Sequence, residues 1–327
     1  MSKSVFKAVI LAGGSGERFW PLSTPERPKQ FLNVFGGESL IRQAVSRLDG
    51  LVAPRDVFVV TTKSLAAATR RELPEVPRAN IVGEPMRRDT GAAVALGVGL
   101  ASEEGDPVIG FFSSDQMVSR PREFRKIVAK AVAVARRKPA IVTIGIKPDC
   151  PATGFGYISP KTRTFVEKPD LETAKKYVKA GYLWNAGMFI ARASTFRRAF
   201  ADHAPALAVL AARKSRSLAS IYAALPKISF DYAVMEHAKN VEVVPGDFGW
   251  DDVGGFAAFD KYFPRDLRGN VREGPCTVVE ASDNICVARS ARISLLGVNN
   301  LVVVTTPNSV LVADKSRLAE MKKLFAK

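Results

Sequence analysis

The chain of 327 residues has few histidines, few cysteines and a shortage of acidic side chains. Its two histidines, His203 and His237, exclude a histidine-rich metal centre. Its three cysteines form no CxxC pair, which indicates neither a disulfide framework nor a zinc site. No apolar run is long enough to cross a membrane, and the first one enters a glycine loop without the cleavage pattern of a signal peptide. We therefore expect a cytoplasmic protein with no membrane partner.

The shortage of acids leaves a formal net charge of +16, from 48 basic and 32 acidic residues. The basic residues are scattered through helical stretches such as "RPREFRKIVAKAVAVARRK" and are not interleaved with aromatic residues. No nucleic-acid-binding motif accompanies them, so we expect no nucleic-acid partner. A positive charge balance does attract small, negatively charged substrates.

Hydrophobic residues make up 47% of the chain, and in its first half short apolar runs alternate with amphipathic patterns. The predicted strands are Lys7–Ala12, Val57–Thr62, Asn80–Val82, Pro107–Phe112 and Ala140–Ile144. The predicted helices are Glu38–Leu48, Lys63–Leu73, Asp89–Glu103 and Arg122–Arg137. The alternation predicts an α/β fold with a Rossmann-like, mostly parallel mixed sheet flanked by helices. Ligands bind outside the carboxyl ends of the strands in such sheets.

The alternation of apolar runs with amphipathic patterns ends near the C-terminus. Short β segments follow one another closely there, in "CTVVEAS", "NICVARS", "RISLLG", "LVVVTT" and "SVLVAD". The spacing predicts β-helix-like coils, and "KSRLAEMKKLF" predicts a closing helix. We therefore expect a catalytic domain over residues 1–263 and a small C-terminal β domain over residues 264–327.

A glycine-rich loop, "LAGGSGERFWPLSTPERPKQFL", follows the first predicted strand. It matches neither a P-loop nor the dinucleotide fingerprint G-x-G-x-x-G. Gly13, Gly14 and Gly16 lack Cβ atoms, so that backbone N–H groups can approach an anion closely. Arg18 and Lys29 add positive charge for phosphate oxygens. The loop thus indicates a phosphate cradle of a different kind.

This loop resembles the signature of the sugar-1-phosphate nucleotidyltransferases, and within them that of the mannose-1-phosphate guanylyltransferases. The resemblance continues, in the family's order, through "GEPMRRDTGAA", "SSDQ", "FGYI", "FVEKP", "WNAGMF", "FDYAVMEHA" and "GWDDVGGF". It implies that the chain transfers the guanylyl group of GTP to mannose 1-phosphate, giving GDP-mannose and pyrophosphate in a Mg²⁺-dependent reaction. It also implies a homo-oligomer, with a dimer as the expected form.

The resemblance assigns roles at the nucleotide end of the site. It places the nucleotide against Leu11, Gly13, Gly14, Gly16, Glu84 and Pro85. The two oxygens of Glu84 can accept hydrogen bonds from N1–H and the 2-amino group of guanine, which is a reason for GTP to be selected. Asp115 and Asp252 are the expected metal ligands, because hard cations prefer carboxylate oxygens. Gln116 departs from the family, which usually has histidine there.

At the sugar end, the resemblance assigns the sugar phosphate to Gly156, Tyr157, Glu167, Lys168 and Asn185. Glu167 can accept hydrogen bonds from two neighbouring hydroxyls, and Asn185 can both donate and accept. Arg18, Lys29 and Lys168 are the expected catalytic residues, since they can balance phosphate charge in the transition state.

Other functions stay open on the residues alone. The same chemistry can serve another pair of substrates, such as glucose 1-phosphate or UTP. A glycosyltransferase that uses a nucleotide-sugar donor shares much of the sheet architecture. A non-catalytic nucleotide- or nucleic-acid-binding protein would account for the net charge and for Gln116.

Overall fold

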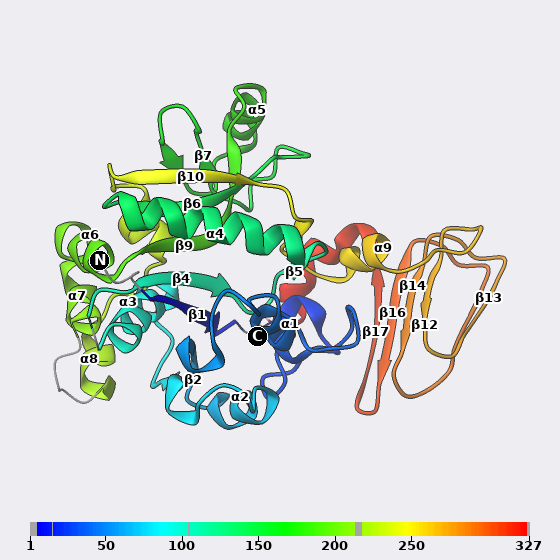
Figure 1. Ribbon diagram of the computed structural model, residues 1–327. Helices are drawn as coiled ribbons and strands as arrows, with labels where there is room; N and C mark the ends of the chain where they lie inside the picture. Colours follow the sequence, from blue (N-terminus) through cyan, green and yellow to red (C-terminus); the bar gives the residue numbers. More distant parts are fainter. Residues whose placement is uncertain (1–4, 15, 104, 213–217, 326–327) are drawn as a thin grey trace. The chain divides into compact units, whose positions relative to one another are not determined.

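A computed structural model describes residues 5–14, 16–103, 105–212 and 218–325. The chain forms two compact units that interleave along the sequence (Figure 1). The first unit comprises the N-terminal residues to Gly13 together with Ile41–Asp251, and the second comprises Gly14–Leu40 together with Asp252–Lys327. The predicted domain boundary after residue 263 stays a prediction.

The first unit contains a nine-stranded mixed sheet, whose main order is β10-β6-β9-β4-β1-β2-β3, with β7 and β8 attached at β9 (Figure 1). Its strands are β1 (Phe6–Ala12), β2 (Val57–Thr62), β3 (Ile81–Glu84), β4 (Val108–Ser113), β6 (Ile141–Ile146), β7 (Tyr157–Ile158), β8 (Phe165–Val166), β9 (Leu183–Arg192) and β10 (Val241–Gly246). Strands β1 to β4 are parallel, whereas β9 runs antiparallel to both β4 and β6. A short ribbon pairs β5 (Met117–Val118) with β11 (Trp250–Asp251). The predicted mixed sheet is confirmed.

Helices cover both faces of this sheet. The α-helices described between β1 and β10 are α1 (Leu40–Ser46), α2 (Ala66–Glu72), α3 (Asp89–Ala101), α4 (Pro121–Arg137), α5 (Leu171–Lys179), α6 (Ala193–His203), α7 (Pro205–Ala211) and α8 (Leu218–Ala224). Phe111 and Phe112 are successive residues of β4, so their side chains point to opposite faces. Phe111 packs on Phe196 of α6, with ring centroids 5.2 Å apart, whereas Phe112 packs on Phe124 of α4 at 6.0 Å.

Helix α3 approaches the sheet closely because it is rich in small residues. A Cβ atom at Gly97 would lie 2.7 Å from the ring of Phe111 and 2.9 Å from Val9. Any larger residue at Gly97 would therefore push the helix off the strands. The close packing fixes the position of the loop before α3, which follows directly after Glu84 at the end of β3.

The carboxyl ends of the parallel strands meet at one edge of the sheet. The register pairs Leu11 of β1 with Ser113 of β4, and Thr62 of β2 with Glu84 of β3. The residues that follow these strands, including Gly13, lie at the same edge. This is the edge at which ligands bind in sheets of this kind.

In the second unit, aromatic side chains join the glycine loop to the segment after Asp252. The loop contains the 3-10 turns η1 (Glu17–Phe19) and η2 (Lys29–Phe31), and the later segment contains η6 (Phe256–Ala258) and α9 (Phe259–Tyr262). The ring of Phe35 contacts the rings of Phe19, Phe259, Tyr262 and Phe263. Apolar burial therefore ties two segments together that are distant in the sequence.

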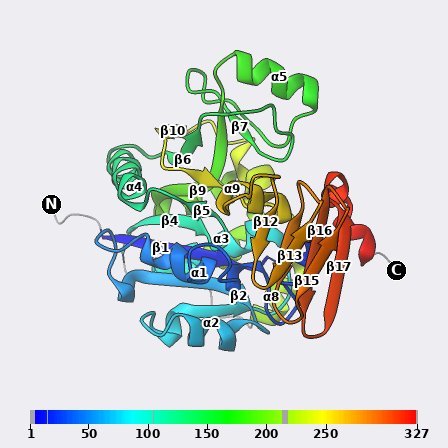
Figure 2. The ribbon, with the colours of Figure 1, turned by 90° about the vertical axis from the view of Figure 1, so that its right-hand side faces the viewer.

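The rest of the second unit consists of short stacked strands (Figure 2). They are β12 (Val271–Glu273), β13 (Cys276–Val279), β14 (Ile285–Ala288), β15 (Ile293–Leu296), β16 (Leu301–Thr306) and β17 (Ser309–Asp314). One sheet has the order β12-β14-β16-β17, and β13 pairs with β15. All pairs are parallel except β16 with β17. The predicted coils are confirmed, and the closing helix η7 (Lys315–Leu324) is a 3-10 helix.

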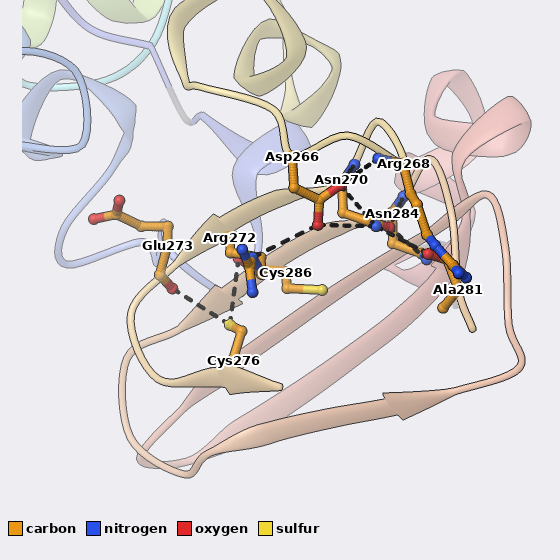
Figure 3. Close-up of polar contacts among 9 residues, drawn as sticks. All are labelled: Asp266, Arg268, Asn270, Arg272, Glu273, Cys276, Ala281, Asn284 and Cys286. Carbon is orange, nitrogen blue, oxygen red and sulfur yellow. Dashed lines mark hydrogen bonds and ion pairs between the residues drawn. The ribbon is translucent and has the colours of Figure 1, made fainter. Parts of the chain in front are cut away.

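Two buried asparagines hold successive coils together (Figure 3). The Oδ1 atom of Asn270 accepts hydrogen bonds from the backbone N and the Nδ2 atom of Asn284, at 3.0 and 2.9 Å. Asn284 in turn donates from Nδ2 to the carbonyl of Val298 and accepts at Oδ1 from the backbone N of Leu301. Each amide thus satisfies backbone groups that the turns leave without strand partners.

Candidate active site

The predicted site residues fall into two groups, one in each unit. The first unit holds Leu11, Gly13, Glu84, Pro85, Asp115, Gly156, Tyr157, Glu167, Lys168 and Asn185. The second unit holds Gly14, Gly16, Arg18, Lys29 and Asp252.

Glu84 ends β3 at the carboxyl edge of the sheet, and only 6% of its surface is exposed. The hydroxyl of Tyr222 donates a hydrogen bond of 3.1 Å to Oε1 of Glu84. Burial raises the pKa of Glu84 to about 7, although the hydrogen bond from Tyr222 and the charge of Arg87 oppose the rise. A Cβ atom at Gly13 would lie 3.6 Å from Oε2 of Glu84, so the carboxyl group lies beside the start of the glycine loop.

An open cavity of about 590 Å³ adjoins this carboxyl group. It is lined by Thr62, Lys63, Ser64, Glu84, Pro85, Met86 and Arg87. The loops after β2 and β3 therefore form a pocket with a carboxyl group and two basic side chains. This chemistry suits a ligand that combines a hydrogen-bonding base with negatively charged phosphates.

Sequence reasoning missed Tyr222, the partner of Glu84. Tyr222 lies in α8, is fully buried, and has its pKa raised by burial and by the adjacent Glu84. Arg88 fixes the end of this helix, because its Nε and Nη2 atoms donate to the carbonyls of Tyr222 and Ala223 at 2.8 and 3.1 Å. The surrounding sequence, "SIYAALPK", carries no motif that could have predicted this role.

Asp115 follows β4 and lies at the same edge as Glu84. The hydroxyl of Ser113 donates a hydrogen bond to its Oδ1 atom. The buried Arg47 donates from Nη2 to the carbonyl of Gln116 at 2.8 Å. Burial lowers the pKa of Arg47 to about 10, and the negative charge of Asp115 opposes that shift. The buried guanidinium group of Arg47 therefore stabilises the ionised form of Asp115. The sequence did not predict this role of Arg47.

Gln116, which stands where the family usually has histidine, connects two strands. Its Nε2 atom donates to the carbonyl of Ala186 in β9 at 3.0 Å. The Gln116 side chain is buried, and its Oε1 atom has no hydrogen-bond partner among the described residues. Gln116 thus keeps the loop that carries Asp115 attached to β9.

The predicted sugar-site residues Gly156, Glu167, Lys168 and Asn185 lie together. The Nζ atom of Lys168 is 2.8 Å from Oε1 of Glu167, and a Cβ atom at Gly156 would lie only 2.5 Å from Oε2. The backbone N of Asn185 donates to the carbonyl of Gly156 at 2.8 Å. Partial burial lowers the pKa of Lys168, but the Glu167 carboxylate outweighs it and leaves that pKa raised. Lys168 has φ = +45°, a strained backbone conformation that is frequent at functional sites.

Tyr157 is placed differently from the other predicted residues of this group. It is fully buried in β7, and its hydroxyl donates to the carbonyl of Ala152 at 2.9 Å. Its polar end is therefore engaged with the backbone, and its ring packs on the ring of Tyr177, with centroids 5.7 Å apart.

Sequence reasoning also missed Asp231, which accepts a hydrogen bond of 2.9 Å at Oδ1 from Nδ2 of Asn185. Asp231 begins η5 (Asp231–Met235), a short π-helix. Such turns are rare and are often found at functional sites. Burial and the neighbouring Glu167 carboxylate raise the pKa of Asp231 above its ordinary value. The motif "FDYAVMEHA" contains this residue, but a π-helix has no sequence pattern that could have predicted its geometry.

In the second unit, Arg18, Lys29 and Asp252 lie together. The buried Lys29 donates from Nζ to the backbone carbonyl of Asp252 at 2.6 Å. A Cβ atom at Gly254 would lie 3.2 Å from Nη1 of Arg18 and 4.0 Å from Oδ2 of Asp252. Val253, a β-branched residue, has φ = +48°, so the turn after Asp252 is strained. Two basic groups and one carboxylate thus converge beside the glycine loop.

No group of three or more histidine, cysteine, aspartate or glutamate side chains that could hold a metal occurs within the described ranges. Hard divalent cations prefer carboxylate oxygens and can be held by one or two of them together with water and substrate phosphate oxygens. The carboxylate of Asp115, beside Ser113 and Arg47, has the chemistry of such a ligand, and its role as a metal ligand stays a prediction.

The two histidines lie away from the carboxyl edge. Their rings are 6.2 Å apart, and both line a cavity of about 580 Å³ with Pro139 and Asn240, which precede β6 and β10. Within the part of the chain that the structure describes, no helix is both long enough and apolar enough to span a membrane.

A mixed α/β sheet with polar groups at the carboxyl ends of its strands is the architecture of nucleotide-binding enzymes. A model of the nucleotidyl transferase family matches residues 7–268, and a model of the MannoseP isomerase/GMP-like beta-helix domain matches residues 274–327. The chain belongs to the nucleotidyl transferase family.

Named relatives agree with this assignment. The mannose-1-phosphate guanylyltransferases of Salmonella muenchen and Escherichia coli (strain K12) are each 34% identical to this chain, over 99% of it and 73% of their own length. A solved structure from Thermus thermophilus, described as a mannose-1-phosphate geranyltransferase, is 35% identical and superposes with a TM-score of 0.89 over 98% of both chains. The resemblance to this family and the prediction of a nucleotidyltransferase are confirmed.

Proposed function

We propose that the chain transfers the guanylyl group of GTP to mannose 1-phosphate, releasing pyrophosphate and forming GDP-mannose. The observation that carries the proposal is the position of Glu84: a buried carboxyl group that ends β3, beside Gly13 and within a cavity lined by Lys63 and Arg87. An ionised Glu84 can accept from both N1–H and the 2-amino group of guanine, whereas adenine offers no such pair of donors. The names of the relatives support mannose 1-phosphate as the second substrate.

In the proposed reaction, an oxygen of the sugar phosphate attacks the α-phosphorus of GTP, and the bond to the pyrophosphate oxygen breaks. The attacking phosphate is largely ionised near neutral pH, so no general base is needed. Catalysis then depends on bringing two anions together and on balancing their charge. Arg18 and Lys29 would contact the triphosphate, and Lys168 would contact the sugar phosphate. Glu167 and Asn185 would hold the sugar hydroxyls.

Asp115 and Asp252 are the proposed ligands of a Mg²⁺ ion. When bound, the ion would neutralise negative charge on the phosphate oxygens. Removal of divalent cations with EDTA should abolish turnover, and added Mg²⁺ should restore it. Asp115→Asn should weaken Mg²⁺ activation by about tenfold or more, because a neutral amide binds a hard cation less well than a carboxylate does. Turnover that persists in EDTA would remove the metal from the proposal.

The decisive experiment offers each of the four NTPs with mannose 1-phosphate or glucose 1-phosphate and measures pyrophosphate release. We expect GTP with mannose 1-phosphate to give the highest kcat/KM. A higher value for another pair would reassign the substrates within the same chemistry. No pyrophosphate from any pair, together with sugar transfer from GDP-mannose, would identify a glycosyltransferase instead.

Two substitutions test the assigned roles. Glu84→Gln should lower the preference for GTP over the other triphosphates, since an amide has one accepting oxygen, and its NH₂ group would face one of the two guanine donors in place of the second carboxylate oxygen. Lys29→Met keeps an apolar stem of similar length but removes the charge, and we expect kcat to fall by about a thousandfold. The far-ultraviolet circular dichroism spectrum of each variant checks that the fold is kept. Turnover of Lys29→Met near that of the wild type would exclude Lys29 from catalysis.

The cytoplasmic location and the dimer are further proposals. They rest on the scarcity of cysteine and on the family, respectively. Sedimentation equilibrium of the purified chain tests the second, and a monomer at micromolar concentration would contradict it.

A further inference from the structure

The sugar site contains one acidic group more than the predicted residues supply. Asp231 and Glu167 approach it from different segments, and Lys168 is the adjacent base. Such a pair of carboxyl groups beside one ammonium group is unexpected where a negatively charged sugar phosphate is to bind, because like charges repel.

The hydrogen bonds of Asn185 determine what its side chain can offer a ligand. Its Oδ1 atom accepts from the hydroxyl of Thr143 at 2.7 Å and from the backbone N of Gly187 at 3.1 Å. Its Nδ2 atom donates to Oδ1 of Asp231 at 2.9 Å. Both lone pairs of the amide oxygen are thus engaged, and one N–H remains for a ligand. A rotated amide would point its NH₂ group at the backbone N–H of Gly187, which can only donate, so Gly187 together with Asp231 fixes its orientation.

The π-helix η5 supports both polar residues of the sugar site. Its first residue, Asp231, holds Asn185, and Glu236, which follows η5, accepts at Oε1 a hydrogen bond of 2.9 Å from the backbone N of Glu167. The backbone N of Glu236 donates to the carbonyl of Asp231 at 3.1 Å and so closes the turn. One short segment therefore holds the side chain of Asn185 and the backbone of Glu167, which come from different parts of the chain.

We propose that Asp231 is a positioning residue of the sugar-phosphate site, which holds Asn185 as a hydrogen-bond donor to the sugar and controls the negative charge beside the bound phosphate. This inference rests on the proposed function. Unlike Glu167 and Asn185, Asp231 acts through its neighbour, because the carboxyl group that it presents is already engaged with the Asn185 amide.

The charge of Asp231 predicts how binding depends on pH. Burial and the adjacent Glu167 carboxylate raise the pKa of Asp231 to about 7, with Lys168 and the Asn185 amide acting in the opposite direction. Below this value Asp231 is neutral, and Glu167 with Lys168 forms a balanced pair. Above it, Asp231 adds a negative charge that repels the sugar phosphate. The affinity for the sugar phosphate should therefore fall as the pH rises through 7, whereas ionisation of Glu84 should favour GTP over the same range.

Two variants separate the hydrogen bond from the charge. Asp231→Asn keeps an oxygen that can accept from Asn185 but cannot ionise. Relative to this variant, the wild-type KM for mannose 1-phosphate should be similar at pH 6 and higher by on the order of fivefold at pH 8.5. The phosphate of the substrate ionises in the same way in both assays. The ratio of the two KM values at each pH therefore reports the effect of Asp231 alone. Asp231→Ala removes the acceptor, and we expect its KM for mannose 1-phosphate to rise about tenfold at every pH while its KM for GTP changes by less than about twofold.

Asp202→Asn is the matched control, because Asp202 is an exposed acid of α6 that pairs with Arg198 at 3.5 Å. We expect neither KM to change there. A KM for mannose 1-phosphate that follows the same pH curve in Asp231→Asn and the wild type would overturn the inference. So would a folded Asp231→Ala variant with an unchanged KM. If Asp231→Ala does not fold, the comparison of Asp231→Asn with the wild type decides.

The pyrophosphate-release experiment with the four NTPs and the two sugar phosphates distinguishes a failure of this inference from a failure of the proposed function. If the wild type turns over another sugar phosphate, the same KM comparison is made with that substrate. If the wild type releases no pyrophosphate from any pair, the proposed function fails and the inference fails with it. If the wild type turns over its substrates normally and the Asp231 variants have the same KM values as the wild type, only the inference is contradicted, and the proposed function stands.

Discussion

The hydroxyl of Tyr222 donates a hydrogen bond of 3.1 Å to Oε1 of Glu84, and both side chains are buried in the first unit. The bond opposes the effect of burial, since it stabilises the ionised carboxylate and lowers the pKa of Glu84. Tyr222 therefore increases the fraction of Glu84 that is ionised at neutral pH. It also fixes the rotation of the carboxyl group relative to Gly13.

Tyr222→Phe should weaken the binding of GTP. Loss of the hydroxyl raises the pKa of Glu84 further above 7, so that more of it is protonated at pH 7 and fewer carboxylates can accept from guanine. We expect KM for GTP to rise about three- to tenfold at pH 7 and to approach the wild-type value at pH 8.5. Steady-state kinetics at both pH values measures the effect.

The control for this variant is Tyr177→Phe, which removes a hydroxyl from α5 in the same unit. Its KM for GTP should stay at the wild-type value. An equal rise in KM at pH 7 and pH 8.5 for Tyr222→Phe would show that Tyr222 acts through packing and not through the ionisation of Glu84.

Gly16 and Gly14 lie two positions apart in the loop but differ in what a side chain would meet. Gly16 has φ = +67°, and a Cβ atom there would lie 2.4 Å from the backbone N of Lys29. At Gly14 the space within 4 Å holds no such atom among the described residues. Gly16→Ala should therefore lower the free energy of unfolding by about 2 kcal/mol or more and displace Lys29.

Gly14→Ala should leave the stability close to that of the wild type. If the bare backbone at Gly14 approaches phosphate oxygens, this variant should nevertheless raise KM for GTP by about tenfold. Urea unfolding and steady-state kinetics on the two variants distinguish the roles. Equal loss of stability in both would contradict the structural distinction, and an unchanged KM in Gly14→Ala would remove Gly14 from the nucleotide site.

The first half of the fold could be predicted because strand and helix patterns alternate with the right lengths. The predicted strand Val57–Thr62 agrees with β2, and the predicted helix Arg122–Arg137 starts one residue after α4 begins. Periodicity reveals burial, and in α4 it places Phe124 on the buried side. It could not reveal that β9 runs antiparallel inside the sheet, because the direction of a strand is set by long-range connections.

Site residues could be predicted where a motif and a strand end coincide, as for Glu84 at the end of β3 and Asp115 after β4, and their roles stay predictions. The residues that hydrogen-bond to these side chains could not be predicted, because they come from segments that are distant in the sequence and meet only in the folded structure. Tyr222 lies 138 positions from Glu84, and Asp231 lies 46 positions from Asn185. Nothing in the local sequence around either residue records such a contact.

Asn284 should be essential to the stability of the second unit. It is fully buried and bonds to Asn270, Val298 and Leu301, so its removal leaves several buried groups without their partners. We expect Asn284→Ala to lower the free energy of unfolding by about 2–3 kcal/mol, measured by urea unfolding. Asn299→Ala, at an exposed position that bonds to Ser282, should cost less than about 1 kcal/mol. An equal cost for the two variants would show that the buried amide network adds nothing.

The raised pKa of Glu84 makes the stability of the folded chain depend on pH. The folded-state pKa is about 7, compared with 4.5 for the free side chain. Below pH 4.5 the group is protonated in both the folded and the unfolded chain, and no stability is lost. As the pH rises to 7 the unfolded chain ionises first, which favours unfolding.

Glu84→Gln cannot ionise and should escape this loss. Between pH 5 and pH 8 its free energy of unfolding, relative to the wild type, should therefore rise by about 2–3 kcal/mol, measured by urea unfolding at both pH values. The comparison removes the contribution of Asp231, which both proteins share. Glu26→Gln, at an exposed acid of the second unit, controls for the loss of one carboxylate. A relative stability of Glu84→Gln that stays constant over this range would mean that Glu84 ionises as readily in the folded chain as in the unfolded one, and that burial does not hold it near neutrality.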